Sequence, residues 1–233
     1  MLGGKHPALI RGAALVVAGN EYLAGFARRA GAKNVEIVPT VIDLNRYSLP
    51  VEYPVIDKSA PLRIGWIGQR STASFLLPYK QLFERISSTG MARFVAIGID
   101  ASSLGLPMKS VPWSEQTEVA CIADCDVGIM PLLDGAFERG KCGYKLIQYM
   151  ACGLPVVASP VGVNRQIVQH GVNGFLTDTL EQWEQALQTL AADADLRRRM
   201  GKAGRIKVEK EYCIQVTGPK LTAMLARIAT AGN

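Results

Sequence analysis

Basic side chains stand beside glycines at a point in the sequence where a helix is expected to begin. In the stretch 140–159, Lys141 and Lys145 flank Gly143, and from Tyr144 onward apolar residues recur at helical spacing until Gly153. The first N–H groups of a helix lack partners within it, and the helix dipole favours an anion at this end. These residues are therefore suited to bind a phosphate group.

A second stretch has the same chemistry. Gly68 and Gln69 follow the apolar run 62–67, and Arg70, Ser71 and Thr72 come directly after them. Backbone amides, two hydroxyls and a guanidinium at a helix start can all donate hydrogen bonds to a phosphate. A capped helix start that binds nothing is the alternative interpretation of this segment.

The elements that would position both stretches alternate between strands and helices. We expect strands over 13–18, 35–39, 62–67, 93–98, 108–113, 126–132 and 156–158, and a turn and strand over 171–176. We expect helices over 21–30, 73–88, 114–123, 144–152, 162–170, 180–192, 194–211 and 215–231. This alternation predicts an α/β fold, a Rossmann-like parallel sheet with helices on both faces. Ligands of such sheets bind at the carboxyl ends of the strands, where both glycine-containing stretches would lie.

Three phrases of the sequence resemble a known family. They are Val38-Pro39 followed by Val41-Ile42-Asp43 and Tyr47, the run YMACGLPVV over 149–157, and IVQHGVNGFL over 167–176. They are similar to motifs of the family 4 (glycosyl transferases group 1) enzymes of GT-B fold, in the carboxy-terminal domain that binds the sugar donor. The resemblance spans most of the chain, from about residue 13 to residue 211.

Two positions depart from the family pattern. Family members usually carry two glutamates eight positions apart, and the matching residues here are Gly140 and Gln148. Asp134 and Glu138 lie upstream and are close enough in sequence to take the first role. The in-helix glutamate is expected to contact the ribose of the donor, and Gln148 keeps one acceptor oxygen for that contact.

The resemblance implies a set of site residues. Lys141, Lys145 and Glu138 are the expected catalytic residues, and the expected donor-binding residues are Gly68, Gln69, Arg70, Ser71, Thr72, Val111, Trp113, Cys142, Gly143, Tyr144 and Gln148. Other interpretations remain open at three of these positions. Trp113 could pack in the core, Gln148 could be a surface residue of an amphipathic helix, and Glu138 could be a solvated charge.

The same resemblance implies the function. The chain is expected to bind a nucleoside-diphosphate sugar for retaining transfer to a saccharide or lipid-linked acceptor, in the synthesis of glycans such as cell-surface polysaccharide. The donor is a co-substrate, and no cofactor is expected. The alternatives are a non-catalytic module that binds nucleotide sugars, and a sugar-nucleotide epimerase of the same architecture.

The resemblance also suggests how the chain is divided. Residues 1–47 would be the tail of a missing amino-terminal acceptor domain and the crossover, 48–61 a connector, 62–212 the nucleotide-sugar-binding domain, and 213–233 a carboxy-terminal helix. Three prolines in the connector discourage regular structure there. An isolated donor domain has no place for the acceptor, so the chain alone is expected to be inactive in transfer.

Composition excludes several other functions. The net charge of +6 permits an anionic partner or a membrane surface, but the basic run 197–210 has no interleaved aromatic residues, so nucleic-acid binding is not expected. Two distant histidines and five scattered cysteines predict no metal site and no disulfide framework. Without a membrane-spanning stretch or a signal peptide, we expect a cytoplasmic protein, with peripheral binding at the inner membrane face left open. Neither a dinucleotide fingerprint nor a Walker loop occurs.

Overall fold

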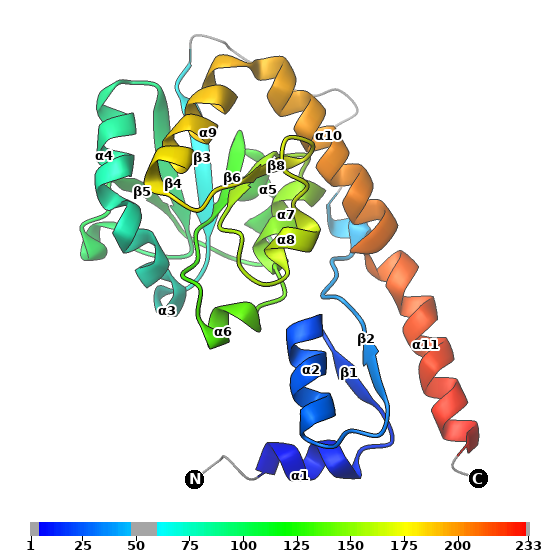
Figure 1. Ribbon diagram of the computed structural model, residues 1–233. Helices are drawn as coiled ribbons and strands as arrows, with labels where there is room; N and C mark the ends of the chain where they lie inside the picture. Colours follow the sequence, from blue (N-terminus) through cyan, green and yellow to red (C-terminus); the bar gives the residue numbers. More distant parts are fainter. Residues whose placement is uncertain (1–4, 48–59, 232–233) are drawn as a thin grey trace.

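The computed structural model describes residues 5–47 and 60–231, and its centre is a six-stranded parallel sheet (Figure 1). The strands are β3 (Leu62–Ile67), β4 (Ala92–Ile97), β5 (Met108–Val111), β6 (Val127–Met130), β7 (Val156–Ala158) and β8 (Gly174–Leu176), in the order β5-β4-β3-β6-β7-β8. The α/β fold predicted from the sequence, a Rossmann-like parallel sheet, is confirmed. The chain first builds outward from β3 to β5 and then returns to place β6 on the other side of β3. That reversal is the switch point at which such sheets bind ligands.

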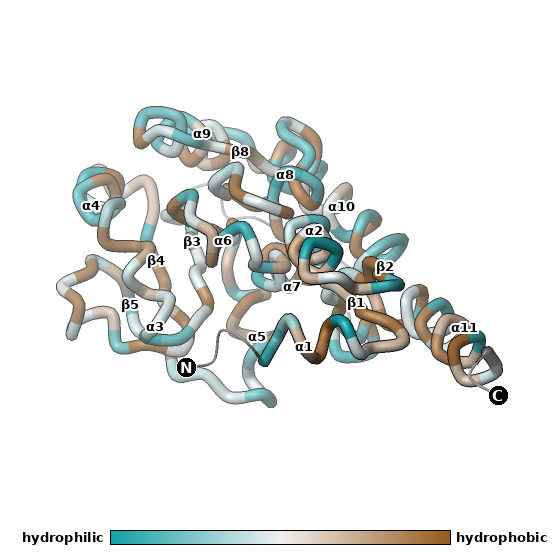
Figure 2. The backbone as a smooth tube through the Cα atoms, turned by 60° about the horizontal axis from the view of Figure 1, so that its bottom comes forward, coloured by the Kyte–Doolittle hydropathy of each residue, from teal (hydrophilic) through white to brown (hydrophobic). Residues whose placement is uncertain are grey.

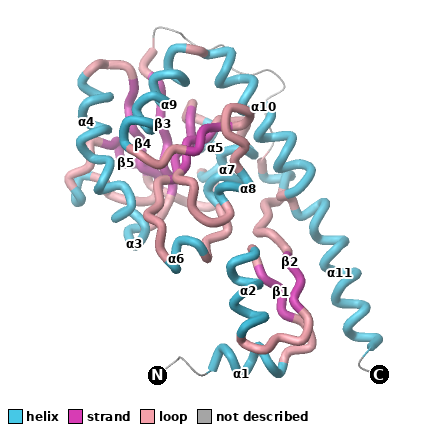
Figure 3. Tube along the Cα trace, in the orientation of Figure 1, coloured by secondary structure: helices cyan, strands magenta, loops and turns pink. Residues whose placement is uncertain are grey.

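Helices cover both faces of this sheet (Figure 3). One face carries α4 (Lys80–Ser88) and α9 (Leu180–Ala192), and the other carries α5 (Glu118–Ala123) and α7 (Tyr144–Ala151), with α10 (Ala194–Glu211) packed on α7. In β7, Val156 and Ala158 join one core cluster while Val157 joins the other. Since successive side chains of a strand point to opposite faces, a strand buried on both sides needs an uninterrupted apolar run.

The covering helices are amphipathic. In Figure 2 teal and brown stretches alternate along α4, α9 and α10, as expected for helices with one face on the core. Trp183, Leu187 and Leu190 of α9 are fully buried, and they meet Leu82 and Phe83 of α4 in the same cluster. This packing fixes the two helices of that face relative to the sheet.

A smaller unit precedes the sheet domain. It consists of α1 (Lys5–Gly12), β1 (Val16–Ala18), α2 (Glu21–Arg29) and β2 (Val35–Ile37), with the two strands parallel. Asn20 caps α2 as predicted, because its side-chain oxygen accepts a hydrogen bond from the Leu23 amide at 2.9 Å. The Asn20 amide also donates to the carbonyls of Gly140 and Lys141, at 3.1 and 3.0 Å, so this cap joins the small unit to the sheet domain.

Three predicted helices were wrong in extent, and the one expected over 114–123 is only α5, which begins at Glu118. The helix expected over 73–88 is three pieces, α3 (Arg70–Ala73), a 3-10 segment (Ser74–Tyr79) and α4. Pro78 lies in the 3-10 segment, where it lacks the N–H that an α-helix interior would use. The helix expected over 162–170 is only α8 (Asn164–Ile167).

The chain ends in α11 (Ile214–Ala231), which leaves the sheet domain beside the crossover. Ile42 forms an isolated bridge with Cys213, and the amide of Ile214 donates to the Ile42 carbonyl at 2.9 Å. Of the predicted connector 48–61, residues 48–59 lie outside the described part of the chain. Among the helices that the structure describes, none combines the length and apolarity needed to cross a bilayer.

Candidate functional site at the switch point of the sheet

A cavity of about 300 Å³ opens at the carboxyl ends of the sheet strands. Its wall is made by residues that follow β3, β4 and β5, by the first residue of α5, and by one face of α7. The lining residues are Ile67, Gly68, Gln69, Thr72, Gly98, Trp113, Glu118, Tyr144, Lys145 and Gln148. The cavity therefore gathers side chains from across half of the sheet domain, beside the β3–β6 switch point.

Tyr149 holds α7 against the strands that form the switch point. Its hydroxyl accepts a hydrogen bond from the amide of Ile67 at 2.9 Å and donates to the carbonyl of Ile129 at 3.3 Å. Gly128 makes this approach possible, since a Cβ there would lie 2.2 Å from the Tyr149 ring. These contacts fix the position and direction of the amino-terminal end of α7.

Two glycines bring the strand ends together beneath the cavity. Gly98 has a φ of +92°, and a Cβ at this position would lie 2.6 Å from the carbonyl oxygen of Gly68. The amide of Gly68 donates to the Ile97 carbonyl at 3.0 Å, which joins the two chain segments directly. A side chain at position 98 would separate these loops, so only glycine fits.

The cationic part of the cavity is at the start of α7. Gly143 precedes the helix with a φ of +68°, and the first amides of α7 have no partner within the helix. The Lys145 ammonium lies 5.5 Å from the centre of the Trp66 ring. Burial, and then the nearby charge of Lys141, lowers the pKa of Lys145 to about 8. A cation that has lost this much solvation interacts strongly with an anionic ligand.

A carboxylate lies in the same wall. Glu118 is 8% exposed, and its two oxygens accept hydrogen bonds from the Tyr47 hydroxyl at 3.0 Å and from the Trp113 indole at 2.8 Å. The side-chain amide of Gln148 donates in turn to the Tyr47 hydroxyl at 3.1 Å. Burial is the main cause that raises the pKa of Tyr47, so this phenol is neutral and can act as both donor and acceptor. The cavity thus contains a connected polar chain as well as a cation.

Seven of the residues predicted from the sequence line this cavity, namely Gly68, Gln69, Thr72, Trp113, Tyr144, Lys145 and Gln148. Two of the alternative interpretations, in which these residues have no part in a site, are wrong. Trp113 does not pack in the core, because it is 51% exposed, and Gln148 is not a surface residue, because it is 2% exposed.

The other predicted residues lie outside the cavity lining. The Arg70 guanidinium donates to the Ser103 hydroxyl at 3.3 Å, Ser71 is exposed, and Val111 packs partly against the core. Gly143 precedes α7 and packs against Ile167, since a Cβ at this position would lie 2.2 Å from the Ile167 side chain. Whether these residues contact a ligand stays a prediction.

The loop before α7 also directs three predicted residues away from the lining. The Lys141 ammonium lies over the rings of Phe137 and Phe75, at 4.6 and 5.2 Å from their centres. The Cys142 thiol faces the small unit, since a Cβ at Gly19 would lie 2.5 Å from its sulfur. Glu138 is on α6 (Ala136–Arg139), half-buried.

Asp134, the other upstream carboxylate, is paired with Arg139 at 2.6 Å. This ion pair holds the pKa of Asp134 below its usual range. Asp134 is therefore already committed to a partner within its own loop.

Sequence reasoning missed Glu118, Gly98 and Ile67, and it gave Tyr47 only as part of a crossover phrase. Glu118 is an acidic residue at a helix start, which is so common that its type and position carry no signal. Its partner Tyr47 is 71 residues before it in the sequence, and Gln148, which donates to Tyr47, is 101 residues after Tyr47. Only the three-dimensional structure brings the three groups together.

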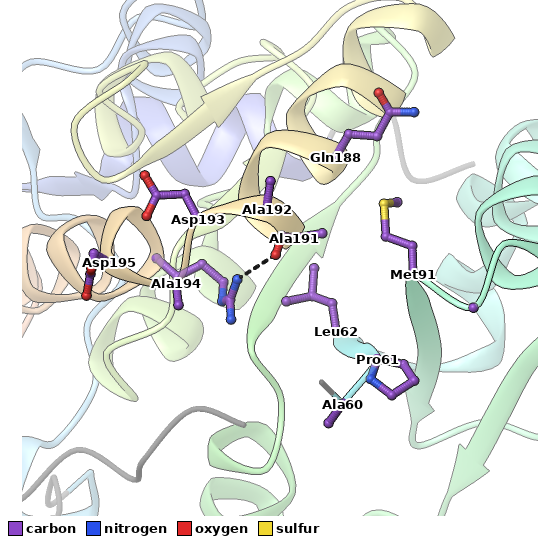
Figure 4. Close-up of a pocket in the computed structure, with 12 residues that line it drawn as sticks. Ala60, Pro61, Leu62, Met91, Gln188, Ala191, Ala192, Asp193, Ala194 and Asp195 are labelled. Atoms are coloured by element: carbon purple, nitrogen blue, oxygen red, sulfur yellow. Dashed lines mark hydrogen bonds between the residues drawn. The ribbon is translucent and has the colours of Figure 1, made fainter. Parts of the chain in front are cut away.

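A second, larger cavity of about 430 Å³ lies at the amino ends of the strands. Figure 4 shows Leu62, Met91, Ala191 and Ala192 around it, with Asp193 and Asp195 at its rim. Arg197 reaches this cavity and donates to the carbonyls of Leu190 and Ala191 in the last turn of α9. Within the described ranges, no group of three or more histidine, cysteine or acidic side chains is placed to hold a metal ion.

The comparisons with known proteins point to one family. Residues 80–193 match the model of the glycosyl transferases group 1. The N-acetyl-alpha-D-glucosaminyl L-malate synthase of Bacillus anthracis is 36% identical over 78 residues, which are 32% of this chain and 20% of that protein. A D-inositol 3-phosphate glycosyltransferase of Thermobispora bispora is 27% identical over 199 residues, 78% of this chain and 45% of that protein. The chain thus spans less than half the length of these two relatives.

A solved structure gives the same result for the fold. HepE from Anabaena, determined with UDP and glucose, superposes with a TM-score of 0.70 over 92% of this chain and 63% of that one, at 16% identity. This likeness covers the sheet and helices described above. It shows that the chain has the Rossmann-like fold of GT-B glycosyltransferases, and residues 80–193 are similar to the glycosyl transferases group 1.

Proposed function

We propose that the switch-point cavity binds a nucleoside-diphosphate sugar, and that this chain supplies the donor side of a retaining glycosyl transfer. The observation that carries the proposal is Lys145, a desolvated cation at the start of α7 with no carboxylate within ion-pair distance among the described residues. A diphosphate would supply the missing charge. The likeness to a protein determined with UDP supports the same assignment.

The roles of these residues in the proposed transfer depend on where negative charge develops during the reaction. When the bond from the anomeric carbon to the diphosphate breaks, charge accumulates on the leaving diphosphate. The Lys145 ammonium and the first amides of α7 would stabilise that charge, because both are fixed in place before the reaction begins. Lys141 would contribute at longer range. The acceptor, a saccharide or a lipid-linked hydroxyl, would have to be positioned by residues outside this cavity.

The Trp113 ring is the surface we assign to the nucleotide base. It is half-exposed at the cavity, and its indole N–H is fixed by Glu118 at 2.8 Å. An aromatic ring that is held in place by its own hydrogen bond loses little freedom when a base stacks on it. This arrangement favours a ligand that has a flat base at one end and a diphosphate at the other.

Titration of the chain with UDP, ADP, GDP and their glucose and N-acetylglucosamine conjugates tests the proposal. We expect binding by calorimetry, with amide chemical-shift changes at 67–72, 113–118 and 143–148, and none at 188–197 around the amino-end cavity. Affinity should fall with added salt. Absence of binding to all of these ligands at millimolar concentration would overturn the proposal.

A second candidate is a binding module without transferase activity. The residues Gly140 and Gln148, at the positions where family resemblance leads one to expect glutamates, favour it. A radiolabelled donor separates the candidates when the chain is supplied with an amino-terminal acceptor domain from a relative: product formation supports the transferase, and binding without turnover supports the module. Interconversion of sugar epimers in the absence of acceptor would support the epimerase instead.

A further inference from the structure

Asn20 is a buried side chain that forms hydrogen bonds in two directions. It is 4% exposed, and its side-chain oxygen accepts from the Leu23 amide in the first turn of α2. Its side-chain nitrogen donates to the carbonyls of Gly140 and Lys141, which are 120 and 121 residues away in the sequence. An amide side chain has two N–H donors and one acceptor oxygen. The oxygen of Asn20 therefore serves the small unit, and its nitrogen serves the loop before α7.

The small unit and this loop are also closely packed around Asn20. The Cys142 sulfur lies 3.8 Å from the Asn20 nitrogen, and a Cβ at Gly19 would lie 2.5 Å from the same sulfur. A Cβ at Gly140 would lie 3.5 Å from the Leu23 side chain, so position 140 faces α2. The loop is therefore held from outside the sheet domain, by the cap of a helix in the small unit.

The loop leads directly into the cationic part of the switch-point cavity. Gly143 ends it, and the Gly143 carbonyl accepts from the amides of Leu146 and Ile147, at 2.9 and 3.3 Å, in the first turn of α7. Tyr149 anchors α7 to the sheet, but it lies more than one turn beyond the first amides of the helix. The path of the loop therefore decides where those amides and the Lys145 ammonium lie.

We propose that Asn20 is a positioning residue for the diphosphate site, because it holds the loop before α7 in the conformation that binds the ligand. The inference rests on the function proposed above, and it gives a role in binding to a residue that is not part of the cavity lining. A loop that has to be ordered when the ligand binds reduces affinity, whereas a loop fixed beforehand does not. Affinity for a diphosphate thus depends on the contact between the small unit and the sheet domain.

The test measures UDP binding to the full chain by titration calorimetry. Asn20→Asp keeps the oxygen that caps α2, but it loses both N–H donors and places a negative charge against the two carbonyls. We expect this variant to bind UDP about tenfold more weakly. Asn20→Ser also keeps a capping oxygen and is too short to reach both carbonyls, so it should bind about threefold more weakly without any added charge.

Asn34→Asp is the matched control. The Asn34 amide donates to the Ala14 carbonyl at 2.9 Å, which is the same kind of bond made entirely within the small unit. Its loss does not affect the loop before α7. UDP affinity should therefore be that of the unmodified chain.

Hydrogen exchange without nucleotide gives a second readout, which separates release of the loop from a general loss of stability. The amide of Lys141 donates to the Glu138 carbonyl, and those of Leu146 and Ile147 donate to Gly143. In Asn20→Asp these three amides should exchange about tenfold faster. Exchange in strands β3 and β6 should stay the same.

The outcomes separate this inference from the proposed function. If the unmodified chain binds no diphosphate, the proposed function fails and this inference fails with it. If UDP binds equally well to the unmodified chain and to Asn20→Asp, only the role of Asn20 is overturned. Weaker binding together with faster exchange throughout the sheet also overturns it, since that result indicates general destabilisation. Asn20→Ser gives the same comparison if Asn20→Asp does not fold.

Discussion

The two ends of the sheet each carry a cavity lined by a cation and at least one carboxylate, yet these charges are used differently. At the amino end, Arg197 donates to two carbonyls in the last turn of α9, and Asp193 accepts from the Leu196 amide at 2.8 Å to cap α10. At the carboxyl end, Lys145 and Glu118 have no oppositely charged partner in the described part of the chain. The charges at the larger cavity therefore serve to end helices, whereas those at the smaller one are available to the ligand that we propose. Cavity size alone would have selected the amino end.

The largest effect expected from this comparison is on stability, at the amino end. Arg197→Met should lower the free energy of unfolding by about 3 kcal/mol, because two helix-end carbonyls lose a charged donor in a buried place. Nucleotide affinity should not change. Chemical denaturation with parallel titration of UDP measures both quantities, and Arg198→Met, at an exposed ion pair of the same helix, is the control. Lost nucleotide affinity in a folded Arg197→Met protein would contradict the comparison.

At the carboxyl end the effect should be on binding. Lys145→Met should weaken UDP by about 30-fold, or about 2 kcal/mol, because a diphosphate loses a charge-assisted contact in a partly desolvated place. The free energy of unfolding should stay the same or rise, since the variant no longer buries an ammonium. Lys141→Met is the matched variant, and its loss should be several-fold smaller because that ammonium lies over Phe137 and Phe75. Equal losses at the two positions would show that the structure does not distinguish them.

The difference between these two lysines also shows how much of the site could be predicted from the sequence. Periodicity predicted the sheet, its helices and the α7 start, because each of those features depends on local patterns and on burial of apolar faces. It could not tell Lys145 from Lys141, since the two differ in their surroundings and not in their type. The Phe75 ring that lies beside Lys141 comes from a segment 66 residues away.

Glu118 was missed for a related reason. Its position depends on hydrogen bonds from Tyr47 and Trp113, which lie in two other segments, and Tyr47 in turn accepts from Gln148 of α7. The split of the predicted helix 73–88 has a local cause in Pro78, and closer attention to that proline would have found it. Local rules thus account for the elements, whereas the site depends on contacts between distant segments.

The next effect is a pH dependence at the carboxyl end. Because burial lowers the pKa of Lys145 to about 8, most free chains carry a neutral amine at pH 9. Diphosphate binding needs the ammonium form, so UDP affinity should fall about tenfold from pH 7 to pH 9, with proton uptake on binding above pH 8. Calorimetry in buffers of different ionisation enthalpy measures that uptake. A flat profile, or the same profile in Lys145→Met, would count against this role of Lys145.

The same shift predicts the sign of a stability change. An unfolded chain titrates this lysine near its ordinary value, so between pH 8 and that value the unfolded state binds more protons than the folded state. The free energy of unfolding should therefore rise with pH in this window through Lys145. The rise should be absent in Lys145→Met. No such contribution is expected from Arg197, which stays charged throughout this window.

The smallest expected effect comes from Gln148→Glu, which restores the residue type that the family resemblance leads one to expect. Gln148 now donates to Tyr47, and Tyr47 donates its single hydroxyl proton to Glu118. With a carboxylate at position 148 this one proton would have to serve two acceptors, so two negative charges would meet in a buried wall with one donor between them. Like charges at such a distance raise the pKa of one carboxyl group until it holds a proton near neutral pH. We therefore expect UDP to bind about threefold more weakly at pH 8, and to recover as the pH falls to 6.

Gln148→Ala separates charge from loss of contact in that experiment. It removes the amide without adding a charge, so its affinity should be low and independent of pH over the same range. If Gln148→Glu instead tightens UDP at pH 8, then Glu118 does not supply the carboxylate of this cavity, and position 148 alone governs the contact to the nucleotide sugar. A gain in affinity would also make the two ends of the sheet more alike. Glu118 would then serve only to accept hydrogen bonds from Tyr47 and Trp113, just as Arg197 serves to donate to the carbonyls at the end of α9.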